Sequence, residues 1–371
     1  MSQVLLPPRR CARCEAPAPD ALAWRCACGG PLEYEWTAHF DPSLIQGNLW
    51  SQWRYGAMLL PPGVPLRTHT SLGEGMTPLT SLMWEGRLVT FKLEFLMPTG
   101  SYKDRGSATL LSVLRAEGHR ALVEDSSGNA GASIAAYAAA AGIDATIFVP
   151  AHASPGKKAQ IAAFGATLRE IEGPRQATSE ACHRAAQTTL YASHAWHPAF
   201  LMGQVAAAWE VWEQMEGKLP DAIVVPLGQG GMLLGYYRGF LALHEAGLID
   251  RMPRLVGVQS TACAPVVHAW ARGEGRVEPV EERETIAEGI RIKAPARGDE
   301  ILRALRESDG FVLAVEDDAI QTARRALAQR GLFVETTSAV PVAALSRVGA
   351  ELGERAAVLV PLSGSGLKEG R

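Results

Sequence analysis

Residues 121–150 read ALVEDSSGNAGASIAAYAAAAGIDATIFVP. A short apolar run at 122–124 precedes a turn of Ser, Gly and Asn, an alanine-rich stretch at 130–141 and a second apolar run at 146–149. The short runs predict strands, and the alanine-rich stretch predicts a helix. Two strands joined through a helix by short turns form a βαβ unit, whose strands lie parallel in one sheet.

The same alternation continues on both sides of this unit, from residue 70 to the end of the chain. Further strands are predicted at 89–95, 222–225, 255–258 and 357–360, and further helices at 107–117, 154–165, 231–246 and 317–331. This order predicts an α/β fold of mostly parallel sheets with helices on both faces. The segments 173–178 and 273–284, rich in Gly, Pro and charge, are predicted to be exposed loops.

The composition is that of a globular protein. The chain has 371 residues, 47% of them hydrophobic and 20% charged, with a formal net charge of −3. This length predicts two or three domains. The charge balance argues against a nucleic-acid binder that relies on overall basicity. No apolar run is long enough to span a membrane. The first ten residues lack a basic head followed by a long apolar segment, so we expect them not to be a secretory signal.

Four of the six cysteines lie in the first 28 residues. Cys11 and Cys14 form one pair, and Cys26 and Cys28 form a second, followed by two glycines. Two such pairs suit a tetrahedral thiolate site for a structural zinc ion. The alternatives are a degenerate ribbon without metal, or cysteines that only pack. Because the cysteines do not form a disulfide framework, we expect a reduced, cytoplasmic compartment.

A lysine stands where a predicted strand leads into a helix, in the turn Met97-Pro-Thr-Gly-Ser-Tyr-Lys103. Burial and the helix dipole both disfavour the ammonium form at such a position. A neutral amine can form a Schiff base with an aldehyde. The alternative is a surface lysine that pairs with Asp104.

Two further turns are rich in small polar residues. Ser126-Ser-Gly-Asn129 opens a helix and suits a carboxylate, while the Asn129 amide can donate to a phenolate-type oxygen. The alternative is plain helix capping by a serine. Gly228-Gln-Gly-Gly-Met232 offers successive N–H groups for one phosphate, although the same pattern also occurs in tight turns without a ligand.

Ser363 follows the last predicted strand, in PLSGSGLK (361–368). Its hydroxyl can donate to a ring nitrogen and would leave that nitrogen unprotonated. Together these turns supply an amine for an aldehyde, a phosphate cradle, donors for a ring oxygen and a ring nitrogen, and a carboxylate site. This set matches what pyridoxal phosphate and an amino acid need.

The sequence resembles the fold type II, tryptophan-synthase-β-like family of pyridoxal-phosphate enzymes, and within it the threonine synthases. Six motifs occur in the family's order: GEGMTPL (73–79), PTGSYKDRG (98–106), SSGNAGAS (126–133), GQGG (228–231), EGIRI (288–292) and SGSGLK (363–368). An N-terminal CxxC…CxCGG module also precedes many threonine-synthase-like chains.

The resemblance implies a role for each matching residue. Lys103 would form the Schiff base, Asn129 would contact the ring oxygen, and Ser363 would face the ring nitrogen. The phosphate would lie on the backbone of Gly228, Gln229, Gly230, Gly231 and Met232, and the substrate carboxylate on Ser126, Ser127 and Gly128. Glu288 and Gly289 would lie along the cofactor.

Two departures from the family pattern concern the substrate. Methionine replaces asparagine at Met76, Met97 and Met232. His194 and His197 occupy positions where threonine synthases carry asparagines that help bind the substrate phosphate, and Leu201 occupies the position of an arginine. A phosphorylated substrate would lose a bidentate contact at Leu201.

Three functions are compatible with these observations. The first is a threonine synthase that converts O-phospho-L-homoserine and water to L-threonine and phosphate, with Lys103 as general base. The second is an ammonia-lyase, dehydratase or β-replacement enzyme for an unphosphorylated amino acid such as serine, threonine or diaminopropionate. The third is a non-catalytic protein that recruits a partner through its cysteine module.

The expected organisation follows from the same resemblance. Residues 1–35 would form the zinc-ribbon-like module, 98–205 the small domain with Lys103, and 36–97 with 206–371 the large cofactor-binding domain. A small-molecule amino acid would be the substrate. Neither nucleic acid nor a membrane would be a partner, and the chain would form a homodimer.

Overall fold

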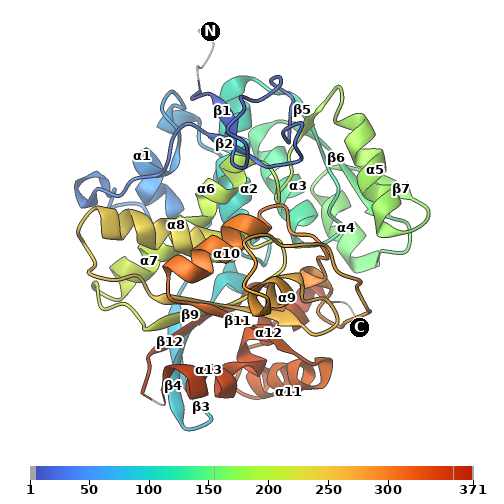
Figure 1. Ribbon diagram of the computed structural model, residues 1–371. Coiled ribbons are helices and arrows are strands. Elements are labelled where there is room, and N and C mark those ends of the chain that lie inside the picture. The colour runs from blue at the N-terminus through green and yellow to red at the C-terminus, as the bar shows by residue number, and fades with distance from the viewer. Residues whose placement is uncertain (1–5, 154, 354, 370–371) are drawn as a thin grey trace. The chain divides into compact units, whose positions relative to one another are not determined.

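The computed structural model describes residues 6–153, 155–353 and 355–369 (Figure 1). The described chain divides into two compact units. Unit 1 comprises the residues up to Met76, Met97–Ala206 and Glu369, and unit 2 comprises Thr77–Leu96 and Ala207–Lys368. Each unit has its own sheet and helices, which confirms the predicted α/β class.

Unit 1 is built on a parallel sheet in the order β7-β6-β5-β8. Its strands are β5 (Ala121–Glu124), β6 (Asp144–Pro150), β7 (Thr167–Ile171) and β8 (Leu190–Tyr191). The helices of this unit are α2 (Lys103–Glu117), α3 (Asn129–Ala141), α4 (Pro155–Ala163), α5 (Arg175–Ala185) and α6 (Pro198–Gln204). The predicted βαβ unit is therefore confirmed as β5, α3 and β6.

Glycines allow α2 and α6 to pack at very short range. A Cβ atom at Gly106 would lie 2.5 Å from the ring of Phe200, and one at Gly203 would lie 2.1 Å from the carbonyl oxygen of Arg105. Real Cβ atoms do not approach so closely, so larger residues at either position would force the helices apart. This packing holds Phe200 beside the first turn of α2.

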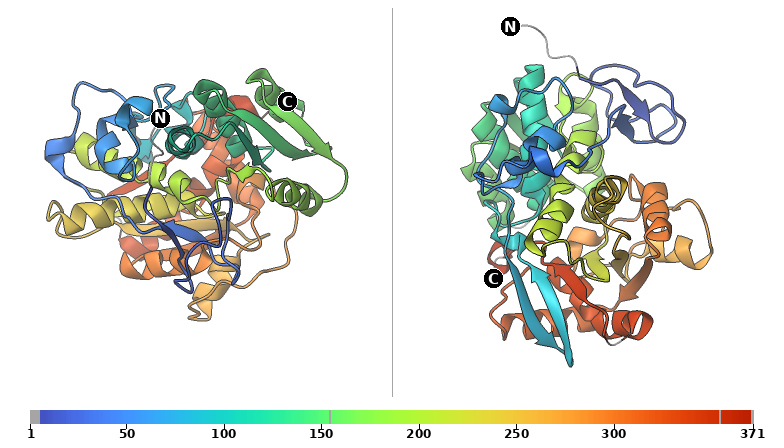
Figure 2. Two further views of the ribbon diagram at one scale, coloured as in Figure 1. Left: turned by 90° about the horizontal axis from the view of Figure 1, so that it is seen from above. Right: turned by 90° about the vertical axis from the view of Figure 1, so that its left-hand side faces the viewer.

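Unit 2 contains a mixed sheet in the order β11-β10-β9-β12-β4-β3. The strands are β3 (Leu79–Trp84), β4 (Arg87–Lys92), β9 (Ala222–Pro226), β10 (Arg254–Ser260), β11 (Phe311–Val315) and β12 (Val358–Pro361). All neighbours are parallel except β3 and β4, which form the cyan hairpin at the edge of the sheet in the right view of Figure 2. The larger helices of this region are α7 (Ala206–Gln214), α8 (Gly231–Glu245), α9 (Pro265–Ala271), α10 (Gly298–Glu307), α11 (Asp317–Ala328), α12 (Thr336–Ala343) and α13 (Leu345–Leu352).

Short elements complete the two units. Near the N-terminus β1 (Arg9–Cys11) pairs with β2 (Leu32–Tyr34), and α1 spans Gly56–Leu59. Single 3-10 turns lie at Pro42–Leu44, Gln52–Tyr55, Leu66–Thr68, Glu94–Leu96, Glu288–Ile290 and Gly366–Lys368. In the part of the chain that the structure describes, no helix has both the length and the apolarity that crossing a membrane requires.

Among the sequence-based boundaries that differ from the structure, two have a clear physical reason. The segment 173–178 is not a loop throughout, because α5 begins at Arg175, directly after Pro174. Proline is well suited to that position, since the start of a helix does not use its missing N–H. The strand predicted at 89–95 ends at Lys92, and Glu94 turns inward to accept a 2.7 Å hydrogen bond from the Thr77 hydroxyl. The predicted loop at 273–284 contains neither helix nor strand.

The compact units group some residues differently from the expected domains. Residues 36–76 fall in unit 1 with Lys103, whereas the expected large domain included them. The cysteine-rich N-terminal segment also belongs to unit 1. The assignment of functional domains therefore stays a prediction.

A buried ion pair ties the edge of the unit 2 sheet to α7. The Lys92 amine lies 2.9 Å from Glu210 Oε2, and neither side chain is exposed to solvent. The same amine donates to the Thr77 carbonyl at 3.1 Å and to Gln214 Oε1 at 3.0 Å. Additional hydrogen bonds of this kind are what make a buried charge tolerable.

Replacing Lys92 with Met is expected to destabilise unit 2 by about 3–5 kcal/mol, because it removes the buried positive charge that pairs with the buried Glu210 carboxylate. The matched control is the double variant Lys92→Met with Glu210→Gln, which removes both charges and should regain most of the loss. Urea unfolding followed by tryptophan fluorescence measures both. Equal losses in the single and the double variant would contradict this explanation.

Candidate active site

Lys103 is the first residue of α2, and its side chain is half-buried. Its Nζ lies 4.7 Å from the centre of the Tyr102 ring and 5.9 Å from the centre of the Phe200 ring. The amine therefore lies against aromatic surfaces at a helix N-terminus, the position that the sequence predicted.

The carboxylate of Asp104 is bound by hydroxyl and amide groups from two segments. It is fully buried and accepts hydrogen bonds from the Thr99 N–H at 2.7 Å, the Thr99 hydroxyl at 2.5 Å and the Ser133 hydroxyl at 2.6 Å. Thr99 lies in the turn before α2, and Ser133 lies in α3. Asp104 thus joins the lysine turn to α3, and because it is buried it does not form the surface ion pair considered from the sequence.

The turn Ser126–Gly128 connects β5 to α3, and Asn129 is the first residue of that helix. The Gly128 N–H donates to the Ser126 hydroxyl at 3.3 Å. A Cβ atom at Gly131 would lie 1.8 Å from the Ser126 carbonyl oxygen, so the turn folds tightly over the helix start. All four residues of 126–129 are partly exposed, and the first N–H groups of a helix have no partner within it.

Two acidic residues come directly before this turn, and their environments differ. Asp125 accepts hydrogen bonds from the Tyr191 hydroxyl at 2.6 Å and the Ser179 hydroxyl at 2.7 Å, and pairs with Arg175 at 2.9 Å. Burial raises the pKa of Asp125, but Arg175 and the two hydroxyls outweigh it and hold the pKa below its ordinary value.

Glu124 is fully buried at the end of β5, and its Oε1 lies 2.8 Å from His194 Nδ1. Burial, with a smaller effect from Asp125, raises the pKa of Glu124 well above its ordinary value. Burial and the charge of Lys103 lower the pKa of His194 well below its ordinary value. Both shifts favour the uncharged forms, a protonated carboxyl and a neutral imidazole.

His197, the second histidine singled out from the sequence, caps a helix. His197 precedes α6, and its Nδ1 accepts a 3.2 Å hydrogen bond from the Ala199 N–H, which caps the helix. Leu201, in the same helix, is buried. A substrate-binding role for His194 and His197 stays a prediction.

The glycine turn of unit 2 leads from β9 into α8. Gly230 has φ +84°, and a Cβ atom there would lie 2.3 Å from Ile301 Cδ1, so the position requires glycine. A Cβ atom at Gly228 would lie 3.0 Å from Ile290 Cα, whereas nothing lies within 4 Å of one at Gly231. The side-chain oxygen of Gln229 accepts a 3.1 Å hydrogen bond from the Ala296 N–H.

Ser363 follows β12, the parallel neighbour of β9, so its turn and the glycine turn leave the same edge of the sheet. Its buried hydroxyl donates to Glu335 Oε1 at 3.0 Å and lies 2.9 Å from the Ser338 hydroxyl.

The other residues that the resemblance singled out lie in varied surroundings. A Cβ atom at Gly289 would lie 2.8 Å from the Thr337 hydroxyl, while Glu288 is exposed. Met232 is buried in α8, and Met76 and Met97 are buried in unit 1.

The structure thus brings the predicted residues together in two groups. Unit 1 gathers Lys103, the turn at 126–129 and His194, and unit 2 gathers the glycine turn and Ser363. Sequence reasoning missed the acidic residues that support them: Glu124, Asp125 and Glu335. One signal was available, because Glu124 and Asp125 stand at a strand end, where parallel sheets place functional groups.

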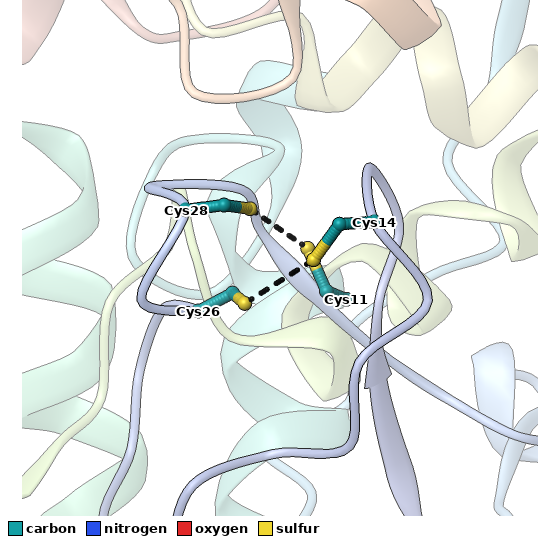
Figure 3. A group of neighbouring side chains, drawn as sticks. All are labelled: Cys11, Cys14, Cys26 and Cys28. Carbon is teal, nitrogen blue, oxygen red and sulfur yellow. Dashed lines mark hydrogen bonds between the residues drawn. The ribbon is translucent and has the colours of Figure 1, made fainter.

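The four N-terminal cysteines converge on one point (Figure 3). Their sulfur atoms all lie within 4.8 Å of one another, with 3.5 Å between Cys11 and Cys28 and 3.6 Å between Cys14 and Cys26. None of them forms a disulfide. A Cβ atom at Gly30 would lie 2.7 Å from the Cys11 sulfur, so glycine leaves the room that the cluster occupies.

Comparison with known proteins agrees with this arrangement. Residues 70–364 match the family described as "Pyridoxal-phosphate dependent enzyme". The chain is 35% identical to a threonine synthase of Mycobacterium tuberculosis over 312 residues, which cover 81% of this chain and 84% of that protein. It is 30% identical to a threonine synthase of Methanocaldococcus jannaschii over an alignment of 380 positions, which covers 97% of this chain and 93% of that protein.

A solved structure is similar as well. The crystal structure of a threonine deaminase from T.th. superimposes with a TM-score of 0.68 at 28% identity and covers 78% of this chain and 92% of its own. The resemblance inferred from the six motifs is therefore confirmed, and the chain belongs to the family of pyridoxal-phosphate dependent enzymes.

Proposed function

We propose that this chain is a lyase that converts O-phospho-L-homoserine and water to L-threonine and phosphate. The observation that carries the proposal is the half-buried Lys103 amine at the start of α2, in a chain 35% identical to a threonine synthase. The amine lies in the same unit as the partly exposed turn at 126–129, where a substrate carboxylate would bind.

The residues of the chain fit the cofactor of this family. The turn at 228–232 begins α8 with N–H groups that have no partner within the helix, and Gly231 faces open space. We propose that this turn holds the phosphate, that Lys103 bonds the aldehyde, that Asn129 contacts the ring oxygen and that Ser363 faces the ring nitrogen. The bound cofactor would draw electrons from the substrate and so acidify its C–H bonds.

The chain's own residues then have separate tasks. The N–H and hydroxyl groups of Ser126, Ser127 and Gly128 would hold the substrate carboxylate in place. Lys103 would remove and return protons at its Nζ. Asp104 would keep that lysine in position, because it joins the turn before α2 to α3 through Thr99 and Ser133.

Two observations favour a second candidate function. Met76, Met97 and Met232 are buried where the resemblance implies asparagines, and the similar T.th. structure is that of a threonine deaminase. An ammonia-lyase, dehydratase or β-replacement enzyme would need the same lysine but no second phosphate site.

Replacing Lys103 with Ala is expected to abolish the visible absorption band that forms when the protein takes up pyridoxal phosphate, because no other amine would bond the aldehyde. Turnover should fall by more than about 1000-fold. Lys218→Ala, at an exposed lysine in unit 2, is the control and should retain both band and turnover. A band that persists in Lys103→Ala would refute the assignment.

The substrate is tested by product analysis. The protein loaded with pyridoxal phosphate is expected to release phosphate and form threonine from O-phospho-L-homoserine. Serine, threonine and diaminopropionate serve as the alternative substrates, and a 2-oxo acid would be their product. Formation of the oxo acid without release of phosphate would replace the synthase proposal with the second candidate.

We also propose that Cys11, Cys14, Cys26 and Cys28 bind one structural zinc ion. Zinc–thiolate bonds of about 2.3 Å in a tetrahedron place the sulfur atoms about 3.8 Å apart. The observed separations of 3.5 and 3.6 Å are close to that spacing. Four thiolates leave no open position on the metal, so the site would stabilise the segment without taking part in the reaction.

Purified protein is expected to contain about one zinc ion per chain, and Cys14→Ser with Cys26→Ser should remove it and lower the melting temperature. The matched control is Cys263→Ala, which changes a cysteine outside the cluster and should retain the metal. Atomic absorption and thermal unfolding make the measurement. Metal-free wild-type protein with an unchanged melting temperature would leave packing as the role of these cysteines.

A cytoplasmic location and a homodimer complete the proposal. The described cysteines are all free thiols, which favours a reducing compartment. The homodimer rests on family resemblance, and the net charge of −3 gives no reason to expect nucleic acid as a partner.

A further inference from the structure

Glu124 and His194 are held together by the topology of the unit 1 sheet. Glu124 ends β5, and His194 follows β8, the parallel neighbour of β5. The carboxyl ends of parallel neighbours meet at one edge, which brings residues 70 positions apart in the chain to a 2.8 Å contact. The turn that is expected to bind the substrate carboxylate leaves from the same edge.

The surroundings of the pair determine where its proton lies. The charged groups that act on both residues are Lys103 on α2, Asp125 beside Glu124 and Arg175 on α5. Burial has the largest effect on each residue, and it favours a protonated carboxyl and a neutral imidazole.

The acid proton belongs on the oxygen that faces His194. Glu124 Oε2 is buried and has no hydrogen-bond partner among the described residues. A hydroxyl on Oε2 would be an unsatisfied buried donor, whereas a hydroxyl on Oε1 donates to His194 Nδ1. The remaining N–H of the neutral imidazole is then at Nε2.

His194 is the accessible member of the pair and lies near the reactive lysine. Its side chain is 17% exposed, while that of Glu124 is not exposed at all. The imidazole packs edge-on against Phe200 at 6.0 Å, and the Lys103 amine lies 5.9 Å from the centre of the same ring. The Glu124–His194 pair therefore ends at the same aromatic ring that the Lys103 amine faces.

We propose that Glu124 and His194 form a proton relay that acts as a second proton donor beside Lys103. His194 gives its Nε2 proton to the substrate side chain, while the Oε1–H bond of Glu124 breaks and an Nδ1–H bond forms. This leaves a neutral imidazole and a Glu124 carboxylate. The charge of a protonated Lys103 favours that carboxylate. Solvent returns the proton to Glu124 by the reverse exchange.

The relay rests on the proposed function, which needs such a donor. When O-phospho-L-homoserine becomes L-threonine, the carbon that loses phosphate becomes a methyl group and must gain a proton. A donor distinct from Lys103 leaves the lysine free to act as the base.

Two substitutions distinguish the supply of a proton by Glu124 from the mere positioning of the His194 ring. Glu124→Gln retains a donor to Nδ1 but has no proton to give, and His194→Gln removes the relay. Turnover should fall about 10-fold or more in Glu124→Gln and about 100- to 10,000-fold in His194→Gln, with KM changed less than about 3-fold. His119→Gln, at a partly exposed histidine that pairs with Glu117, is the control and should match the wild type.

Both variants should still form the Lys103-dependent visible band, which shows that fold and cofactor site are intact. Nitrogen NMR of labelled histidine in the full chain should give a His194 signal with its proton on Nε2. That imidazole should stay neutral well below about pH 6.5, the ordinary range for histidine.

Wild-type turnover in Glu124→Gln, or a His194 imidazole protonated on Nδ1, would overturn the relay while the proposed function stands. If the wild type releases no phosphate from O-phospho-L-homoserine, the proposed function fails instead. The NMR result then still supports or refutes the protonation of the pair.

Discussion

The buried carboxylate of Asp104 is the constraint on which the lysine turn depends. A charge without solvent must be hydrogen-bonded, and Thr99 and Ser133 supply the donors from two separate segments. The turn before α2 and the helix α3 are therefore fixed to the same carboxylate. Because Asp104 is directed to these groups, the neighbouring Lys103 amine is left against the rings of Tyr102 and Phe200.

The pKa values of the two neighbouring acidic residues at the end of β5 are shifted in opposite directions, for clear physical reasons. Asp125 faces Arg175 and two hydroxyl groups, and so its ionised form is stabilised. Glu124 faces a neutral imidazole in a dry environment, and so its protonated form is stabilised. Environments that separate the pKa values of two adjacent acids suit them to different roles. Asp125 is suited to supporting the turn as a carboxylate, and Glu124 to carrying the proton that the proposed relay requires.

The predictions made from the sequence all rest on patterns within short stretches of the chain. The strand-helix alternation, Lys103, the turn at 126–129 and the glycine turn each stand in one short stretch of chain. The partners of these residues come from far away in the sequence: His194 is 70 residues from Glu124, and Glu335 is 28 residues from Ser363. Strand β8 has only two residues, too few for a periodic pattern, so the pairing that positions His194 was not visible.

The cysteine segment is linked to the residues before the turn at 126–129 through aromatic contacts. Trp24 stacks on His183 at 4.5 Å and meets the edge of Tyr191 at 5.4 Å. The hydroxyl of that tyrosine donates to Asp125, the residue before the turn at 126–128. A zinc ion at the proposed cysteine site would order residues 11–28 and, through Trp24 and Tyr191, the residue that precedes the turn. If the turn binds the substrate carboxylate as proposed, loss of that ion would weaken substrate binding without any contact between the two.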